Sequence, residues 1–147
     1  MVDSQARFEQ LITKLRLMGF RMTPQRMALM HLLTISNEHP SAARLYEQIK
    51  VEFPTMSLAT VYKTLDLLKT MGEVFDIDLP DDSHFDAYQP YPHPHFICTN
   101  CQKIVDGQLD EPVHILVNEM EHISGFQIHR HKLVFYGLCP DCQENTQ

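Results

Sequence analysis

Two Cys-x-x-Cys pairs constrain the fold of this 147-residue chain more than any other feature of its sequence. Cys98 and Cys101 form the first pair, and Cys139 and Cys142 form the second. Each spacing lets two thiolates reach one tetrahedral ion, and four soft ligands with no open position are typical of structural Zn²⁺. The intervening segment must then fold back, so that the last strand and the tail meet the first strand of this region. A redox-active pair, buried thiols and a four-thiolate iron site remain alternatives.

Four cysteines in two close pairs favour a metal site over disulfides when the compartment is reducing. The N-terminal stretch, MVDSQARFEQL, mixes acidic and amide side chains and lacks the apolar core of a secretory signal. No apolar run approaches the roughly 20 residues that a membrane span needs. We therefore expect a cytoplasmic protein with no membrane partner.

Residues 1–88 carry the pattern of a winged helix-turn-helix domain, in which short helices are followed by a two-stranded hairpin. Hydroxyl side chains at Thr23, Ser41 and Ser57 each precede an amphipathic stretch and predict helix N-caps. We expect helices over residues 4–18, 24–35, 42–53 and 58–71, and strands over residues 74–79 and 84–89. A turn between the strands is predicted at residues 80–83.

The fourth predicted helix presents a short polar face that suits the major groove of DNA. Hydroxyls and a lysine can reach phosphates, and a tyrosine ring can contact a thymine methyl group. The candidate DNA-binding residues are Ser57, Thr60, Tyr62, Lys63 and Thr64. A solvated helix face is the simpler alternative. The net charge of −7 argues against indiscriminate nucleic-acid binding, but nine of the twelve Lys and Arg residues lie within residues 1–90.

A short proline-rich linker over residues 89–93 leads to a second domain, residues 94–147. We expect strands over residues 95–100 and 103–109, a helix over residues 111–124 and a long strand over residues 126–139. The whole chain is then of the α+β class, with a small C-terminal α/β domain. A domain of about 55 residues gains stability from a metal and from dimerisation.

A second group of candidate ligands surrounds the first cysteine pair. His93 and His95 alternate and so point to the same side of an extended segment, with Asp86 before them and Asp106 on the next strand. His39 joins them if the loop between the second and third helices folds back. Three imidazoles and two carboxylates suit Fe²⁺, Mn²⁺ or Zn²⁺. Alternatively, the two alternating histidines belong to a surface loop, and His39 only flanks a helix.

Six stretches of the chain, in this order, resemble the Fur family of metal-dependent repressors. They are TPQR at 23–26, HPSAARLY at 39–46, SLATVYKTL at 57–65, HFD at 84–86, PHPHFICTNCQKIVD at 92–106 and YGLCPDC at 136–142. The resemblance implies a homodimer with an N-terminal winged helix and a C-terminal α/β dimerisation domain. It also implies that the dimer binds palindromic operators in double-stranded DNA when its regulatory metal is bound.

The same resemblance assigns metal ligands residue by residue. It implies a regulatory Fe²⁺ or Mn²⁺ site of His39, Asp86, His93, His95 and Asp106, and structural Zn²⁺ at the four cysteines. The stretch KIVD, which ends at Asp106, resembles the peroxide-sensing PerR branch, whereas iron-sensing members more often carry glutamate there.

The prolines on either side of His93, Pro92 and Pro94, depart from the family pattern by removing an acidic residue often found there. A third metal site involving His114, His129 or His131 is therefore left open, with a solvated strand and helix face as its alternative.

The resemblance implies a sensor and not a turnover enzyme. On the peroxide-sensing interpretation, Fe²⁺ at the regulatory site generates a local oxidant from H₂O₂ that oxidises His39 or His93. An oxidised imidazole is a poorer ligand, so the metal leaves and repression is lifted. An iron-sensing or zinc- or manganese-sensing repressor of the same family is the nearer alternative, and a metallo-enzyme with a structural zinc ribbon is the remote one.

Overall fold

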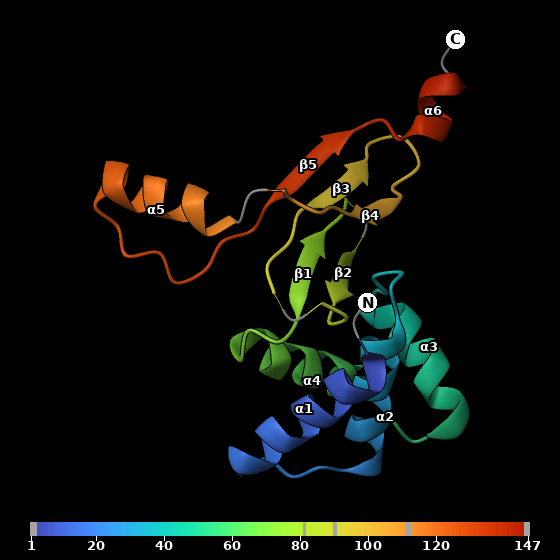
Figure 1. Cartoon of the computed structure of the whole chain (residues 1–147). Helices are drawn as coiled ribbons and strands as arrows, with labels where there is room; N and C mark the ends of the chain where they lie inside the picture. The colour runs from blue at the N-terminus through green and yellow to red at the C-terminus, as the bar shows by residue number, and fades with distance from the viewer. Residues whose placement is uncertain (1–2, 81, 90, 111–112, 146–147) are drawn as a thin grey trace. The chain divides into compact units, whose positions relative to one another are not determined.

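The computed structural model describes residues 3–80, 82–89, 91–110 and 113–145. Contacts between residues divide it into two compact units, residues 1–90 and residues 91–147. The elements described in the first unit are α1 (Ser4–Leu17), α2 (Pro24–Ile35), α3 (Ala42–Glu52), α4 (Leu58–Thr70), β1 (Phe75–Asp78) and β2 (Ser83–Asp86) (Figure 1). Helices followed by a hairpin form a winged helix, as the sequence predicts. The predicted turn includes Asp81, which lies outside the described residues.

Side chains cap the helices of the first unit where the sequence predicts. Thr23, Ser41 and Ser57 each accept a hydrogen bond from the backbone N–H three residues on, at 3.2, 3.1 and 3.2 Å. Each such cap stabilises a helix by about 1 kcal/mol. Gly19 and Gly72 follow the ends of α1 and α4 with φ of 83° and 71°, a left-handed conformation that glycine adopts without steric cost.

One hydrophobic core fills the first unit, because apolar residues recur at helical spacing in all four helices. Its side chains that are at most 2% exposed include Leu11, Leu15, Leu29, Met30, Leu33, Leu45, Ile49, Val61, Leu65 and Leu68. Burying each leucine or isoleucine stabilises the fold by about 1.5–3 kcal/mol. Phe85 of β2 packs against the same core, so the helices anchor the hairpin.

Strand β2 contacts the loop between α2 and α3 as well as its hairpin partner. The Phe85 N–H donates to the Pro40 carbonyl at 3.0 Å, and Ser41 forms an isolated antiparallel bridge with His84. These contacts hold the start of α3 against the strand. The loop and the strand carry one candidate metal ligand each.

A buried ion pair fixes α1 against the residues that flank the hairpin. Arg7 is 4% exposed and donates to the Glu73 carboxylate at 2.8 Å, to the Glu73 carbonyl at 2.9 Å and to the Ala87 carbonyl at 3.2 Å. Lys14 forms an ion pair with the same carboxylate. Burial raises the pKa of Glu73, but hydrogen bonds from Lys14 and Arg7 outweigh this effect, and the pKa lies below its usual value.

Glu73→Ala is expected to destabilise the first unit by about 1.5–3 kcal/mol, because it removes the part-buried carboxylate that accepts from the guanidinium of Arg7. Glu47 forms an exposed ion pair with Lys50, and Glu47→Ala, the matched control, is expected to cost at most about 1 kcal/mol. Urea unfolding followed by circular dichroism measures both changes.

The same ion pair predicts a pH dependence. Folding lowers the pKa of Glu73, so its stabilising effect is present above the unfolded-state pKa of about 4.3 and is lost as the pH falls through the lower folded-state pKa. The stability difference between the wild type and Glu73→Ala should therefore shrink below about pH 4. A difference that stays constant down to pH 2 would contradict this account.

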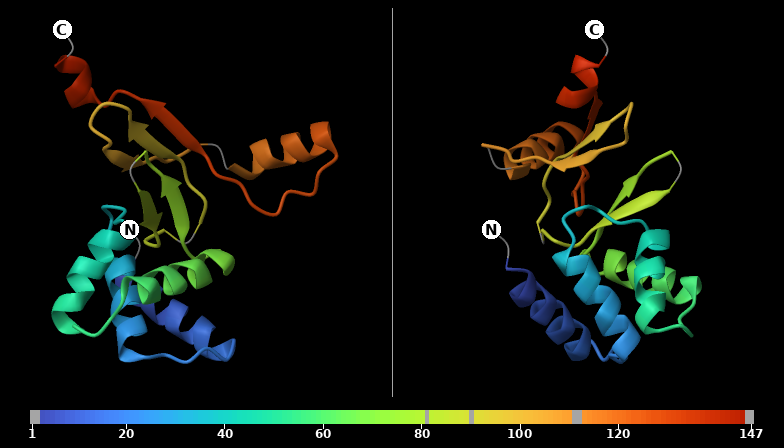
Figure 2. Two further views of the ribbon diagram at one scale, coloured as in Figure 1. Left: turned by 180° about the vertical axis from the view of Figure 1, so that it is seen from behind. Right: turned by 90° about the vertical axis from the view of Figure 1, so that its right-hand side faces the viewer.

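The second unit is built on a three-stranded sheet. Its described elements are β3 (His95–Cys98), β4 (Ile104–Asp106), α5 (Val113–Ser124), β5 (Val134–Gly137) and α6 (Pro140–Glu144). The strand order is β4-β3-β5, with β3 antiparallel to β4 and parallel to β5 (Figure 2). Opposite β3 residues, the register places Asp106 beside His95 and Gly137 beside Cys98.

Helix α5 lies to the side of this sheet and buries none of its described side chains (Figures 1 and 2). Its apolar residues Ile115, Leu116, Met120 and Ile123 are 40–69% exposed. On the sheet, Phe135 and Tyr136 of β5 are also exposed, at 45% and 65%. Both elements therefore leave an apolar face uncovered within the chain. Across the described ranges, no helix is both long and apolar enough to cross a bilayer.

One prediction for the second unit is wrong, and one helix is found that the sequence analysis does not predict. The strand predicted over residues 126–139 is confined to Val134–Gly137, because its partner β3 is only four residues long and the earlier residues have no strand to pair with. Helix α6 was not predicted, although Pro140 at its first position is a common start signal. The predicted helix start at Glu111 lies outside the described residues, as does Pro90 of the linker.

Candidate metal centres and DNA interface

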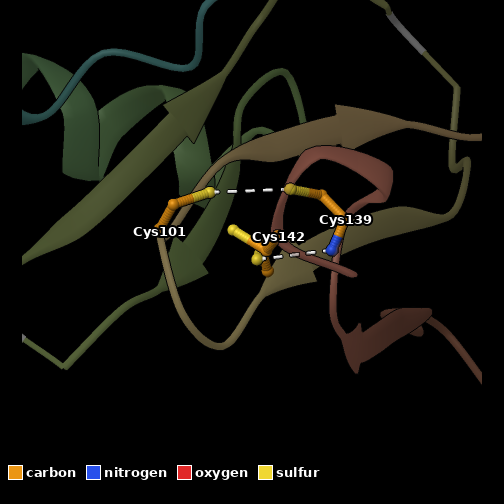
Figure 3. A group of neighbouring side chains, drawn as sticks. Cys101, Cys139 and Cys142 are labelled. Atoms are coloured by element: carbon orange, nitrogen blue, oxygen red, sulfur yellow. Dashed lines mark hydrogen bonds between the residues drawn. The ribbon is translucent and has the colours of Figure 1, made fainter. Parts of the chain in front are cut away.

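The four cysteines come together in the second unit at a spacing that suits one metal ion. Figure 3 shows three of them, Cys101, Cys139 and Cys142, with their side chains side by side. Their sulfur atoms all lie within 4.8 Å of one another, and the Sγ atoms of Cys101 and Cys139 are 3.8 Å apart. Zn²⁺ binds thiolates at about 2.3 Å, which gives about 3.8 Å between two sulfurs of a tetrahedron. The donor set and its spacing therefore fit Zn²⁺, as the sequence predicts.

The sheet brings the two cysteine pairs together. Cys98 ends β3 and lies opposite Gly137, the last residue of β5, so the chain beyond β5 returns beside the first pair. The Thr99 N–H donates to the Gly137 carbonyl at 2.8 Å, and the Cys139 N–H donates to the Cys98 sulfur at 3.4 Å. Parallel pairing of β3 with β5 thus determines where the second pair lies.

The surroundings of Cys98 and Cys142 shift the pKa values of their two thiols in opposite directions. Backbone N–H groups of Cys101 and Cys139 lower the pKa of the Cys98 thiol to about 6. The Asn100 amide favours the Cys142 thiolate, but the neighbouring cysteines and burial outweigh it and raise the pKa of Cys142 to about 12. A divalent cation among the sulfurs would offset two of the four thiolate charges and take the place of protons on the sulfurs.

Cys139→Ser is expected to remove zinc and unfold the second unit, since structural zinc contributes about 10–16 kcal/mol of apparent binding free energy to small domains. Metal analysis and near-ultraviolet circular dichroism measure both effects. Lys103→Ala is the control and should keep its zinc, because it removes an exposed side-chain ion pair with Asp141, at 3.5 Å, and keeps the Lys103 carbonyl that accepts from the Cys98 N–H. Acidification should release zinc from the wild type, because protons compete for the thiolates.

A second donor group lies at the other end of β3. Asp106 Oδ1 lies 3.2 Å from His93 Nε2 and 3.3 Å from His95 Nε2. Both histidines are buried, and the Asp106 side chain is 22% exposed. His93 Nδ1 lies 2.9 Å from the Tyr91 carbonyl, which can only accept, so Nδ1 carries a proton and Nε2 is the ring atom that faces Asp106. These nitrogen and oxygen donors suit Fe²⁺, Mn²⁺ or Zn²⁺.

The backbone beside Asp106 allows the close approach of these donors. Gly107 donates its N–H to the Pro94 carbonyl at 2.7 Å. A Cβ added at Gly107 would lie 2.5 Å from the Phe96 ring and 2.9 Å from the Pro94 ring. Glycine is therefore required for β4 to lie this close to the segment that carries the two histidines.

Gly107→Ala is expected to push Asp106 away from the histidines and to weaken Mn²⁺ binding about 10-fold or more, with zinc retained. Gly137→Ala is the control, because no heavy atom lies within 4 Å of an added Cβ there. Isothermal titration with Mn²⁺ compares the two variants. Equal affinities would exclude close packing at Gly107 as a requirement for the site.

In the first unit, His39 and Asp86 form a buried imidazole–carboxylate pair. His39 Nε2 lies 3.5 Å from Asp86 Oδ2, and the two side chains are 2% and 1% exposed. The Tyr88 N–H donates to the other carboxylate oxygen at 3.0 Å and orients it. His39 has a φ of 51°, a left-handed conformation that costs a non-glycine residue about 1–3 kcal/mol. Strain of this kind occurs most often at functional sites.

A third metal site involving His114, His129 or His131 stays a prediction. Pro92, His114, His129 and His131 line a surface cavity of about 350 Å³ in the second unit. The three histidines belong to no cluster of described residues whose ligand atoms lie within 4.8 Å of one another. His114 and His129 are exposed, whereas His131 is half-buried, and its Nε2 is buried with no hydrogen-bond partner among the described residues.

Helix α4 exposes most of its predicted DNA-facing residues. Ser57, Thr60 and Lys63 are exposed, and Tyr62 is 41% exposed. Thr64 is an exception to the prediction, because it is 1% exposed and its hydroxyl donates to the Thr60 carbonyl at 3.0 Å. A spacing of three and four residues places it on the buried face with the apolar side chains of the helix. That spacing was the missed signal.

Comparisons with known proteins cover both units. Residues 17–136 match the family described as FUR: Ferric uptake regulator family. The chain is 38% identical over 139 residues to the peroxide-responsive repressor PerR of Staphylococcus saprophyticus, covering 92% of this chain and 91% of that protein. It is similar to the solved Campylobacter jejuni peroxide stress regulator, with 32% identity, a TM-score of 0.70 and coverage of 90% and 97%. For PerR from Streptococcus pyogenes the identity is 33%, the TM-score 0.54 and the coverage 93% of both chains.

Proposed function

Because the chain belongs to the ferric uptake regulator family, we propose that it is a metal-dependent DNA-binding repressor of the peroxide-stress response. The observation that carries the proposal is the separation of two ligand chemistries. Four sulfurs lie together at one end of β3, while imidazoles and a carboxylate lie together at the other. A permanent Zn²⁺ and an exchangeable second metal therefore have different ligands.

The proposed regulatory site consists of His39, Asp86, His93, His95 and Asp106 around one Fe²⁺ or Mn²⁺. His39 and Asp86 belong to the proposed DNA-binding domain, residues 1–88. His93 ends the proposed linker, residues 89–93, and His95 and Asp106 lie in the proposed dimerisation domain, residues 94–147. A metal with ligands in both domains restricts their relative orientation. It favours the DNA-binding conformation by its differential affinity for that conformation.

Proposed DNA contacts come from the exposed face of α4, namely Ser57, Thr60, Tyr62 and Lys63. A homodimer presents two copies of this helix, which suits half-sites of a palindromic operator about one helical turn, or a multiple, apart. The uncovered apolar faces of α5 and β5 support dimerisation through residues 94–147. Thiolates held for metal binding suit the reducing cytoplasm, where we expect the protein to act.

The proposed signal is oxidation of a regulatory ligand. Bound Fe²⁺ supplies the capacity to activate H₂O₂ close to the imidazoles. In the net reaction, one oxygen of H₂O₂ is added to a ring carbon of His39 or His93, and the other leaves as water. The oxidised ring binds the metal poorly, so the constraint on the two domains is lost and the repressor leaves its operator.

Mass spectrometry after peroxide treatment tests this signal. Protein loaded with Fe²⁺ is expected to gain one oxygen on the peptide that contains His39 or His93, whereas protein loaded with Mn²⁺ is not. Peptides containing His114 or His131 are internal controls. Absence of the added oxygen in the Fe²⁺ form would favour an iron-sensing or a zinc- or manganese-sensing repressor of the same family.

Gel-shift titration tests the proposed regulatory site itself. His93→Ala and Asp106→Ala are each expected to abolish Mn²⁺-dependent operator binding and to keep one zinc per chain, because the thiolate cluster does not involve them. His131→Ala is the matched control and should bind like the wild type. Unchanged binding by His93→Ala would exclude the proposed site. Binding that does not weaken steeply with salt, or does not depend on operator sequence, would instead favour a metallo-enzyme.

A further inference from the structure

The backbone of His39 is held in place by a side chain that is not a proposed metal ligand. His84 Nδ1 of β2 lies 2.6 Å from the His39 carbonyl oxygen. A carbonyl can only accept, so His84 carries a proton on Nδ1 and donates it. The contact links two residues that are 45 positions apart in the chain.

The backbone of His39, whose carbonyl accepts this hydrogen bond, has an unfavourable conformation. His39 has a φ of 51° and precedes Pro40, and a residue before proline is sterically restricted to extended conformations. A return to negative φ would rotate the Cα–Cβ bond and turn the imidazole away from Asp86, which lies 3.5 Å from Nε2. Some other contact must therefore stabilise the observed backbone.

Strand β2 supplies that contact and also carries Asp86. Immediately after His39, the Phe85 N–H donates to the Pro40 carbonyl at 3.0 Å, and Ser41 bridges to His84. These two backbone contacts fix the chain beyond His39. The hydrogen bond from the His84 ring adds a third contact with β2, at the carbonyl of His39 itself.

From this geometry we infer that His84 is a positioning residue for the regulatory metal site: its Nδ1–H holds His39 in the left-handed conformation that directs the imidazole toward Asp86. The inference rests on the proposed function, because it assigns a role to His84 only if His39 binds the regulatory metal. His84 then acts through the backbone of a ligand. It preorganises the pair in the metal-free protein, so that binding does not have to supply the energy of ordering the loop.

Three substitutions separate the hydrogen bond from the volume of the ring. His84→Phe keeps a ring and removes the donor. His84→Asn keeps a donor, because its amide nitrogen occupies roughly the place of Nδ1. His31→Phe is the matched control, since His31 is an exposed histidine of the same unit that contacts the Phe8 ring. If His84→Phe does not fold, His84→Leu replaces it.

The experiment is a Mn²⁺ titration of the full-length, zinc-loaded chain. We expect His84→Phe to weaken Mn²⁺ binding about 10- to 100-fold, the usual effect of removing a hydrogen bond that orients a ligand. His84→Asn should recover most of the loss, and His31→Phe should bind like the wild type. In metal-free protein, the Phe85 amide should exchange hydrogen faster in His84→Phe than in His84→Asn.

Wild-type affinity in His84→Phe, together with lost affinity in His93→Ala, would overturn the inference and leave the proposed function intact. Equal weakening by His84→Phe and His84→Asn would also overturn it, because the donor would then make no difference. Wild-type affinity in His93→Ala and Asp106→Ala would overturn the regulatory site itself. Zinc content, measured in every variant, confirms that the thiolate site is intact.

Discussion

Strand β3 hydrogen-bonds to a different partner on each edge, and this double pairing determines both donor groups of the second unit. Antiparallel pairing with β4 places Asp106 opposite His95, and parallel pairing with β5 places Gly137 opposite Cys98. The strand is only four residues long, so the imidazoles lie at its first residue and the thiolates lie at its last residue. A shift of its register by one residue would reverse the direction of every side chain and disrupt both groups.

The donor chemistry keeps the two groups distinct. Thiolate sulfurs at the spacing of a zinc tetrahedron bind a metal permanently, and their mutual repulsion makes the cation part of the fold. Imidazole and carboxylate donors bind first-row metals more reversibly. In the first unit, the His39–Asp86 pair is buried, and β2 holds both of its residues, so the fold itself sets the geometry of the pair.

Several local features could be read from sequence because their cause is local. The caps at Thr23, Ser41 and Ser57 depend on a hydroxyl three residues before an orphan N–H, and all three are confirmed. The prediction for Thr64 is wrong because a hydroxyl does not by itself indicate exposure, and the helical position of Thr64 groups it with buried leucines. The strand predicted over residues 126–139 failed for a different reason. Alternation in sequence does not show how many partner residues are available, and β3 offers only four.

The sequence by itself determined which donor atoms the candidate sites can offer. These are four thiolates in two pairs, two alternating imidazoles, and the carboxylates of Asp86 and Asp106. Side-chain type and spacing along the chain are sufficient for that, since a metal recognises its ligands by softness and charge. Only the tertiary structure decided which groups support those ligands. The strained backbone of His39, the His84 contact that holds it and the space that only Gly107 leaves beside Pro94 all join residues distant in sequence. Such contacts depend on the packing of one strand against another, which no local pattern encodes.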